Sequence, residues 1–156
     1  MRLTDLLNDK TIISELKSKE KIGVINELID LFKDDARVIN IEKVRQKVLE
    51  REKIMSTGVG KNFAVPHGKT DAVNDIVCAF GKSTEPIDYQ SLDQQPVHLV
   101  FLLIGQDNSV SSHIKLLSRI SRMMTKDEFR GKLIKATTVE EIHSAFRDEE
   151  KDYIDL

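Results

Sequence analysis

The chain has 156 residues, 40% hydrophobic and 32% charged, a composition typical of one soluble domain with a single core. Lys and Arg total 24 against 26 Asp and Glu, and this net charge of −2 argues against nucleic-acid binding, which favours a basic excess. One cysteine excludes an intrachain disulfide. With neither an apolar signal segment nor the ~18 apolar residues of a membrane span, we expect a cytoplasmic protein without direct membrane insertion.

Residues 1–33 predict an N-terminal segment followed by a helix. Residues 1–16 mix short apolar pairs with polar residues, which favours one short helix or an edge strand. Residues 19–33 carry apolar side chains at helical spacing, which predicts an amphipathic helix. The members of this stripe are Ile22, Ile25, Leu28, Ile29 and Phe32.

A second helix is predicted over residues 40–55, with Asn40 as its N-cap. Its buried face holds Ile41, Val44 and Val48 and continues to Arg51 and Met55. A guanidinium is therefore predicted on the core-facing stripe. It either extends outward at the helix end, where a cation suits the helix dipole, or points at an anion near His67.

The stretch from Gly58 to Lys69 is the most informative part of the sequence. Two glycines open it, a short apolar run over residues 63–65 follows, and Pro66 stops strand pairing because it has no N–H. His67 follows this proline and is presented at a strand end, where α/β folds place reactive groups. An ordinary surface-loop histidine fits the same residues, and the stretch alone leaves both interpretations open.

Two apolar runs predict buried strands. Residues 76–80 form an unbroken apolar run that is typical of a strand buried on both faces. Residues 97–104 are the most apolar segment and predict the central strand, with His98 as a structural residue at its start. The polar segment 83–95 predicts a loop, with at most a short strand at 87–89.

A helix is predicted from the loop at residues 106–112 to about Thr125. Its apolar residues are Ile114, Leu117, Ile120 and Met124 on one face, with Leu116 and Met123 beside them. His113 lies in the first turn, where free N–H groups and positive potential lower a histidine's pKa. It either packs on the next turn as a structural residue or takes part in a site.

The last part of the chain predicts a short helix over residues 126–135 and a final helix opened by a capping box from Thr138 to Glu141. His143 in that helix is interpreted as structural. Residues 148–156 predict a frayed tail, so that the core of a single domain over residues 1–156 spans about residues 3–147.

Arg51, His67 and His113 together provide what an anion site needs. A neutral imidazole at His67 can take a phosphoryl group directly, and such a transfer depends on positioning and on positive charge around the phosphoryl oxygens. Arg51 would supply a bidentate fork, and His113 with the N–H groups of its helix would supply further donors.

Residues 49–54 (LEREKI), 58–60 (GVG) and 63–68 (FAVPHG) closely resemble the signature of phosphotransferase-system enzyme IIA domains. The branch is the one shared by fructose-type, mannitol-type and nitrogen-regulatory IIA proteins, also called type 2. Further matches are residues 94–97 (QQPV) and 112–114 (SHI), so the resemblance runs from the second helix to the last.

The resemblance implies an α/β fold: a single three-layer domain with a mixed, roughly five-stranded sheet flanked by helices. It implies that His67 accepts phosphate from the carrier HPr and passes it to a IIB domain, with His113 as the second histidine of the site and Arg51 beside the phosphoryl group. It implies no metal and no organic cofactor. An apolar collar around His67 is expected, because two partners dock there.

Two functions of different classes follow. The first is a phosphocarrier in sugar uptake, with the fructose type favoured. The second is a regulatory module whose phosphorylation state controls a partner protein through the added charge. The loop at residues 56–60 and the run at 66–69 lean slightly toward the regulatory branch. A histidine-based zinc hydrolase is a much weaker interpretation, because the sequence has no cysteine cluster and no HExxH motif.

Overall fold

The apolar runs form the two long central strands of a mixed sheet, β5 (Val77–Ile87) and β6 (Val97–Gly105), which pair antiparallel. The computed structural model describes residues 1–153. The sheet has the order β1-β5-β6-β3-β2, and β4 also pairs with β6. The shorter strands are β1 (Ile12–Ile13), β2 (Gly58–Gly60), β3 (Phe63–Ala64) and β4 (His67–Lys69).

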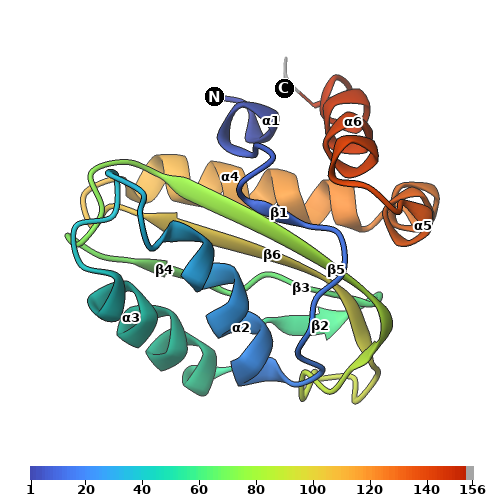
Figure 1. Cartoon of the computed structure of the whole chain (residues 1–156), viewed down its shortest axis with the longest axis horizontal. Coiled ribbons are helices and arrows are strands. Elements are labelled where there is room, and N and C mark those ends of the chain that lie inside the picture. The colour runs from blue at the N-terminus through green and yellow to red at the C-terminus, as the bar shows by residue number, and fades with distance from the viewer. Residues whose placement is uncertain (154–156) are drawn as a thin grey trace.

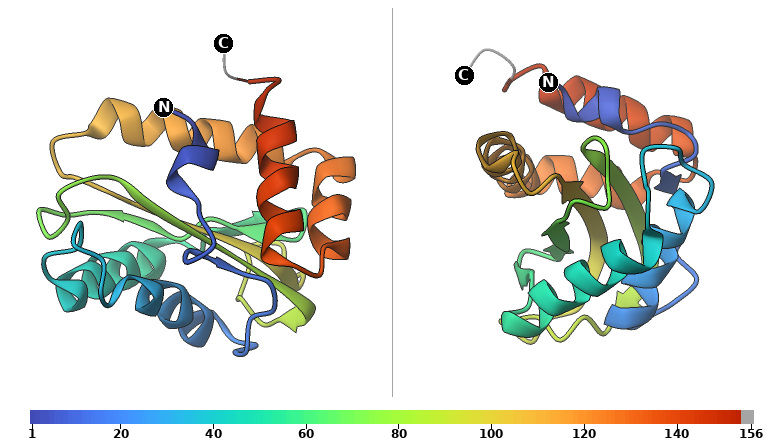
Figure 2. Two further views of the ribbon diagram at one scale, coloured as in Figure 1. Left: turned by 45° about the horizontal axis from the view of Figure 1, so that its top comes forward. Right: turned by 90° about the vertical axis from the view of Figure 1, so that its left-hand side faces the viewer.

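Helices cover both faces of this sheet (Figures 1 and 2). One face carries α2 (Lys21–Ile29), the 3-10 helix η1 (Asp30–Phe32) and α3 (Ile41–Ile54). The other carries α1 (Leu3–Leu6), α4 (Val110–Met124), α5 (Asp127–Lys135) and α6 (Val139–Glu150). The predicted α/β class, with a mixed sheet of about five strand positions between two helical layers, is confirmed.

The core divides into two halves because neighbouring side chains of a strand point to opposite faces. Leu99, Phe101 and Leu103 of β6 contact the α1, α4, α5 and α6 layer, whereas Val100 and Leu102 contact the α2 and α3 layer. The continuous apolar run of β6 is therefore buried on both sides. This confirms residues 97–104 as the central strand.

Pro66 does not end strand pairing as predicted. β3 pairs with β6 through Phe63 and Leu99, and β4 pairs with β6 through His67 and Leu103, both parallel and in one continuous register. The proline lacks an N–H, but its carbonyl still accepts a hydrogen bond from the Leu103 N–H at 3.1 Å. His67 therefore lies in a strand, and its interpretation as a loop residue is wrong.

The loop predicted over residues 83–95 is also partly wrong, because β5 continues to Ile87. Its pairing with β6 shifts between Lys82 and Ile87, so that residues 83–86 bulge away from the ladder. An irregular stretch of this kind accommodates Pro86, which cannot donate a ladder hydrogen bond.

The frayed tail predicted from residue 148 is wrong for residues 148–153, and residues 154–156 lie outside the described part of the chain. The Glu150 carboxylate accepts hydrogen bonds from the N–H groups of Leu3 (2.6 Å) and Thr4 (3.0 Å), which ties α6 to α1. Tyr153 is buried, with the Arg122 guanidinium 5.5 Å from its ring centroid. Contact with the N-terminus, which local sequence does not reveal, holds this segment.

Three apolar residues predicted to be buried are exposed instead: Ile22, Met55 and Ile114. The buried residues of α2 are Val24, Ile25, Leu28 and Ile29, so Ile22 flanks the actual stripe.

Both predicted N-caps are confirmed. Asn40 and Thr138 each accept a hydrogen bond from the backbone N–H three residues further on. No helix within residues 1–153 has both the length and the apolar character needed to cross a membrane.

Candidate functional site

His67 opens β4 and is held in one orientation by its own backbone. Its Nδ1 lies 2.9 Å from the Val65 carbonyl oxygen. A carbonyl can only accept, so this contact requires the proton on Nδ1. In the neutral ring, Nε2 then carries the free lone pair.

Burial lowers the pKa of His67 below its ordinary value, and the positive charge of Arg51 lowers it further, while the Val65 carbonyl acts in the opposite direction. The imidazole is therefore neutral at pH 7. A neutral ring with one protonated nitrogen and one free lone pair is ready to act as a nucleophile.

His113 lies beside His67, with the two ring centroids 5.6 Å apart and the rings inclined at 53°. It is only 4% exposed. Burial lowers its pKa to about 4, with smaller contributions from His67 and Lys69. Neither ring nitrogen has a hydrogen-bond partner within residues 1–153, which is unusual for a buried polar group.

Two glycines allow this close packing. A Cβ added to Gly105, at the end of β6, would lie 2.7 Å from His113 Nδ1. A Cβ added to Gly68 would lie 3.2 Å from Val48 Cγ2 and 3.4 Å from the Val48 backbone nitrogen. The missing side chains let β6 approach the His113 ring and let β4 lie against α3, the helix that carries Arg51.

Arg51 lies in the last turn of α3, half-exposed, and its Nη1 donates a hydrogen bond to the Met55 carbonyl at 2.9 Å. The prediction that it occupies the core-facing stripe is wrong. The buried face of α3 runs from Val44 and Val48 to Glu52. A step of four residues, from Val48 to Glu52, is closer to the helical period of 3.6 than the step of three that leads to Arg51. Arg51 flanks that face.

One shallow pocket contains all three predicted side chains, Arg51, His67 and His113. Its other lining residues are Lys47, Glu50, Ile54, Gly68, Lys69, Asp107, Ile114 and Leu117. The structure thus gathers on one surface the three groups that the sequence separates by up to 62 positions. His98 and His143 lie elsewhere, where His98 contacts Asn62 and His143 bonds the Thr4 carbonyl.

Glu52 is the residue of this region that the sequence analysis missed. It is 5% exposed, and its carboxylate accepts hydrogen bonds from the N–H (2.8 Å) and the hydroxyl (2.6 Å) of Thr57. The signal that points to it is a carboxylate four residues after Val48, on the buried stripe of the helix.

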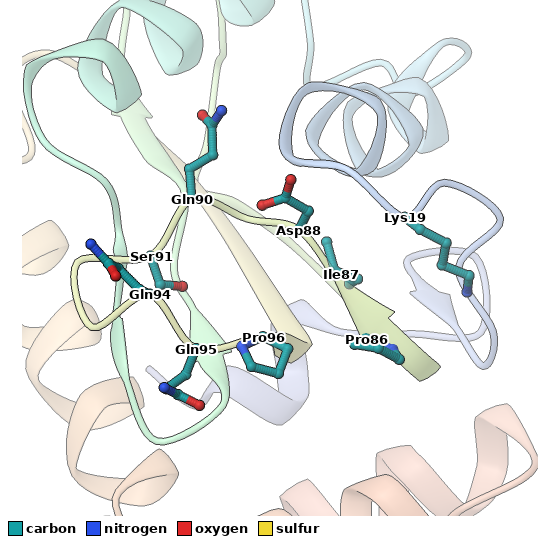
Figure 3. Close-up of a pocket in the computed structure, with 9 residues that line it drawn as sticks. All are labelled: Lys19, Pro86, Ile87, Asp88, Gln90, Ser91, Gln94, Gln95 and Pro96. Carbon is teal, nitrogen blue, oxygen red and sulfur yellow. The ribbon is translucent and has the colours of Figure 1, made fainter.

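A second pocket, of about 620 Å³, lies at the opposite end of β6 (Figure 3). It is formed by Lys19, the end of β5 and the loop that leads into β6. None of its nine lining residues is a histidine or a cysteine, and none is Arg51, His67 or His113. Among residues 1–153, no group of three His, Cys, Asp or Glu side chains is arranged to hold a metal ion.

A mixed sheet between two helical layers, with two histidines in one pocket, defines this chain as an α/β domain, and comparison with known proteins defines its family. The model of the family described as "Phosphoenolpyruvate-dependent sugar phosphotransferase system, EIIA 2" matches residues 5–149. The chain therefore belongs to this family of phosphotransferase-system components, as the sequence signature predicts.

Relatives within the family carry two kinds of name. The chain is 35% identical to the fructose-specific EIIABC component of Bacillus subtilis over 97% of its own length, but it spans only 24% of that protein. It is 34% identical to a nitrogen regulatory protein of Bradyrhizobium diazoefficiens, covering 92% of this chain and 94% of the relative. The relatives therefore include both sugar-specific and nitrogen-regulatory proteins.

Solved structures show the same fold. The nitrogen regulatory protein IIA-Ntr from Neisseria meningitidis superposes with a TM-score of 0.86 at 25% identity, covering 92% of this chain and 98% of that one. IIAMTL in a complex with phosphorylated IIBMTL from Escherichia coli superposes with a TM-score of 0.78 at 21% identity, covering 91% and 97%.

Proposed function

We propose that this chain is a phosphocarrier that accepts a phosphoryl group from an HPr-type carrier on His67 and passes it to a IIB domain for sugar uptake. The observation that carries this proposal is the contact between His67 Nδ1 and the Val65 carbonyl, which leaves Nε2 as the free nucleophile. Family membership supports the phosphotransfer role, and the fructose-specific relative favours a sugar of the fructose type.

In the transfer, the Nε2 lone pair of His67 attacks the phosphorus of the incoming phosphohistidine. A new N–P bond forms while the N–P bond of the donor breaks, and the donor ring recovers its lone pair. The Nδ1 proton of His67 stays on the ring, where it remains bonded to Val65. The reverse sequence delivers the phosphoryl group to the next acceptor, so neither direction needs a metal or an organic cofactor.

Arg51 and His113 line the same pocket as His67 and would support this step. The Arg51 guanidinium supplies positive charge and N–H donors to the phosphoryl oxygens. The neutral His113 ring has one N–H with no partner among the described residues, and a phosphoryl oxygen would satisfy it.

The rim of the pocket suits transient docking of two different carriers. Ile54 is 79% exposed and Ile114 is 60% exposed, and both line the pocket that contains His67. They form only part of the rim, which also carries Lys47, Glu50, Lys69 and Asp107, so the mostly apolar collar expected from the sequence is present only in part. Large apolar side chains left in water around a reactive group favour a partner surface, and a small interface of this kind releases its partner readily. In the comparison structure, IIAMTL is bound to phosphorylated IIBMTL, which supports a IIB domain as the acceptor here.

A nitrogen-regulatory role is the second candidate. It is favoured by the Bradyrhizobium diazoefficiens relative, of which this chain covers 94%, and by the TM-score of 0.86 to IIA-Ntr. In that role the His67 phosphoryl group would control a partner protein through its charge rather than move on to a IIB domain.

The test is incubation of the protein with phosphoenolpyruvate, enzyme I and HPr, followed by measurement of bound phosphate. We expect one acid-labile phosphate per chain, and His67→Ala should remove it while the control His98→Ala keeps it. His113→Ala should still be labelled but should pass phosphate on more slowly. Labelling retained by His67→Ala would overturn the proposal, and a panel of IIB domains separates transport from regulation.

A further inference from the structure

We propose that Glu52 is a positioning residue for phosphoryl transfer, which acts through residues 55–57 to orient both Arg51 and His67. This inference rests on the proposed function for its kinetic consequence. Its structural part, the orientation of the His67 ring, can be measured without any partner protein.

The Glu52 carboxylate anchors the segment that follows α3. Its Oε2 accepts the Thr57 N–H at 2.8 Å and forms an ion pair with Lys21 Nζ at 3.2 Å. Its Oε1 accepts the Thr57 hydroxyl at 2.6 Å and the Tyr89 hydroxyl at 3.0 Å. Each oxygen therefore has two polar partners, and the segment after the helix is held from both its backbone and its side chain.

A chain of hydrogen bonds leads from this carboxylate to the reacting ring. The Thr57 carbonyl accepts the Val65 N–H at 3.3 Å, and the Val65 carbonyl contacts His67 Nδ1 at 2.9 Å. The position of Thr57 therefore sets the position of the Val65 peptide, and that peptide selects the Nδ1-protonated form of His67. Glu52 is the buried end of this series of hydrogen bonds.

The same segment also holds the arginine. Arg51 Nη1 donates to the Met55 carbonyl at 2.9 Å, two residues before Thr57. Met55 and Thr57 lie in one short connection between α3 and β2, so a shift of this connection would move Arg51 and His67 together. Arg51 and His67, the two groups that would act on the phosphoryl group, are thus positioned by the same segment, residues 55–57.

This arrangement needs a carboxylate rather than an amide. A carboxylate offers two accepting oxygens, which matches the donors that surround Glu52, whereas glutamine offers one accepting oxygen and turns an NH₂ group toward the others. Glu52→Gln should therefore leave Thr57 imperfectly held and remove the ion pair with Lys21.

Glu150 provides a matched control. It is 1% exposed and accepts two backbone N–H groups and the Thr4 hydroxyl, and Arg119 lies 3.2 Å from it as its cation. It joins α6 to α1 and lines no part of the His67 pocket. Glu150→Gln thus removes a comparable buried carboxylate without touching the proposed path.

The experiment combines ¹⁵N NMR of the His67 ring with phosphorylation kinetics in wild type, Glu52→Gln and Glu150→Gln. In wild type we expect Nδ1 to be protonated and Nε2 to be bare. Glu52→Gln should give a mixture of the two tautomers and slow labelling by phosphorylated HPr about tenfold or more. Glu150→Gln should lower the melting temperature but keep the wild-type tautomer and rate.

A Glu52→Gln variant with the wild-type tautomer and rate would overturn the inference, as would an equal effect of Glu150→Gln. If Glu52→Gln does not fold, Thr57→Val removes one of the carboxylate's donors at nearly constant volume. It should shift the tautomer and slow labelling a few-fold, and no change in either would count against the inference. Failure of the proposed function would instead appear as a wild-type protein that takes up no phosphate, and the tautomer measurement would still decide whether Glu52 orients the ring.

Discussion

Replacing Gly105 with alanine should displace the His113 imidazole and slow phosphoryl transfer. A Cβ at this position would lie 2.7 Å from His113 Nδ1, whereas ordinary contact begins near 3.4 Å. The ring must therefore move by about 0.7 Å, because Gly105 belongs to the central strand and the ring is the more movable partner.

The size of the effect follows from that displacement. A misplacement near 1 Å can cost about 100-fold in rate, so we expect transfer to slow by about 10- to 100-fold. Overpacking a buried site typically costs about 1–3 kcal/mol of the free energy of unfolding. For a domain of this size, each kcal/mol lowers the melting temperature by about 2–4 °C.

The assay is rapid-quench measurement of transfer from radiolabelled phospho-HPr, with thermal unfolding followed in parallel. Gly131→Ala is the matched control, because a Cβ there meets no atom within 4 Å and alanine favours the helix α5 that contains it. Wild-type transfer by Gly105→Ala would refute the reasoning, and so would an equal loss of rate in Gly131→Ala.

Three further predictions concern stability. Because the pKa of His113 is lowered to about 4 by burial, the unfolded chain binds its proton more readily between pH 6.5 and about pH 4. The free energy of unfolding should therefore fall as pH falls through this window. In urea unfolding at a series of pH values, His113→Gln should lose less of this free energy between pH 6.5 and about pH 4 than wild type does, and an equal loss in both proteins would contradict this. Phe146→Ala should cost about 3–5 kcal/mol in urea unfolding, since its buried ring meets Phe80 edge-on at 5.0 Å, and a loss below 1 kcal/mol would count against the described core. Thr138→Ala should cost about 1 kcal/mol through loss of the 3.1 Å hydrogen bond from the Glu141 N–H, with no change in the transfer rate.

Local patterns in the sequence predicted most of the elements because their causes are local. Asn40 and Thr138 each satisfy a free N–H of the helix that follows, and both caps are present. The apolar run 97–104 predicts a strand buried on both faces, and the two halves of the core pack on its alternate side chains. The ordered signature around His67 predicted the family and, with it, the mixed sheet.

Predictions failed where distant contacts decide the structure. Pro66 looks like the end of a strand, but pairing resumes at His67 because β6 supplies a partner in the same register. Residues 148–153 look like a frayed tail, but Glu150 is bonded to the opposite end of the chain. No window of sequence around either residue contains the group that it pairs with.

The amino-acid sequence by itself determined the class of domain, the family and the identity of His67, His113 and Arg51 as candidate groups, because each depends on residue types and short spacings. The tertiary structure alone decided that these three groups share one pocket, which ring nitrogen of His67 is free, and that Glu52 rather than Arg51 is buried. The physical reason is that a proton's place on an imidazole and the burial of a charge depend on partners brought close by folding. Lys21 and Tyr89 reach Glu52 from distant parts of the sequence, and pairing with β6 fixes the strand in which the Val65 carbonyl contacts the His67 ring.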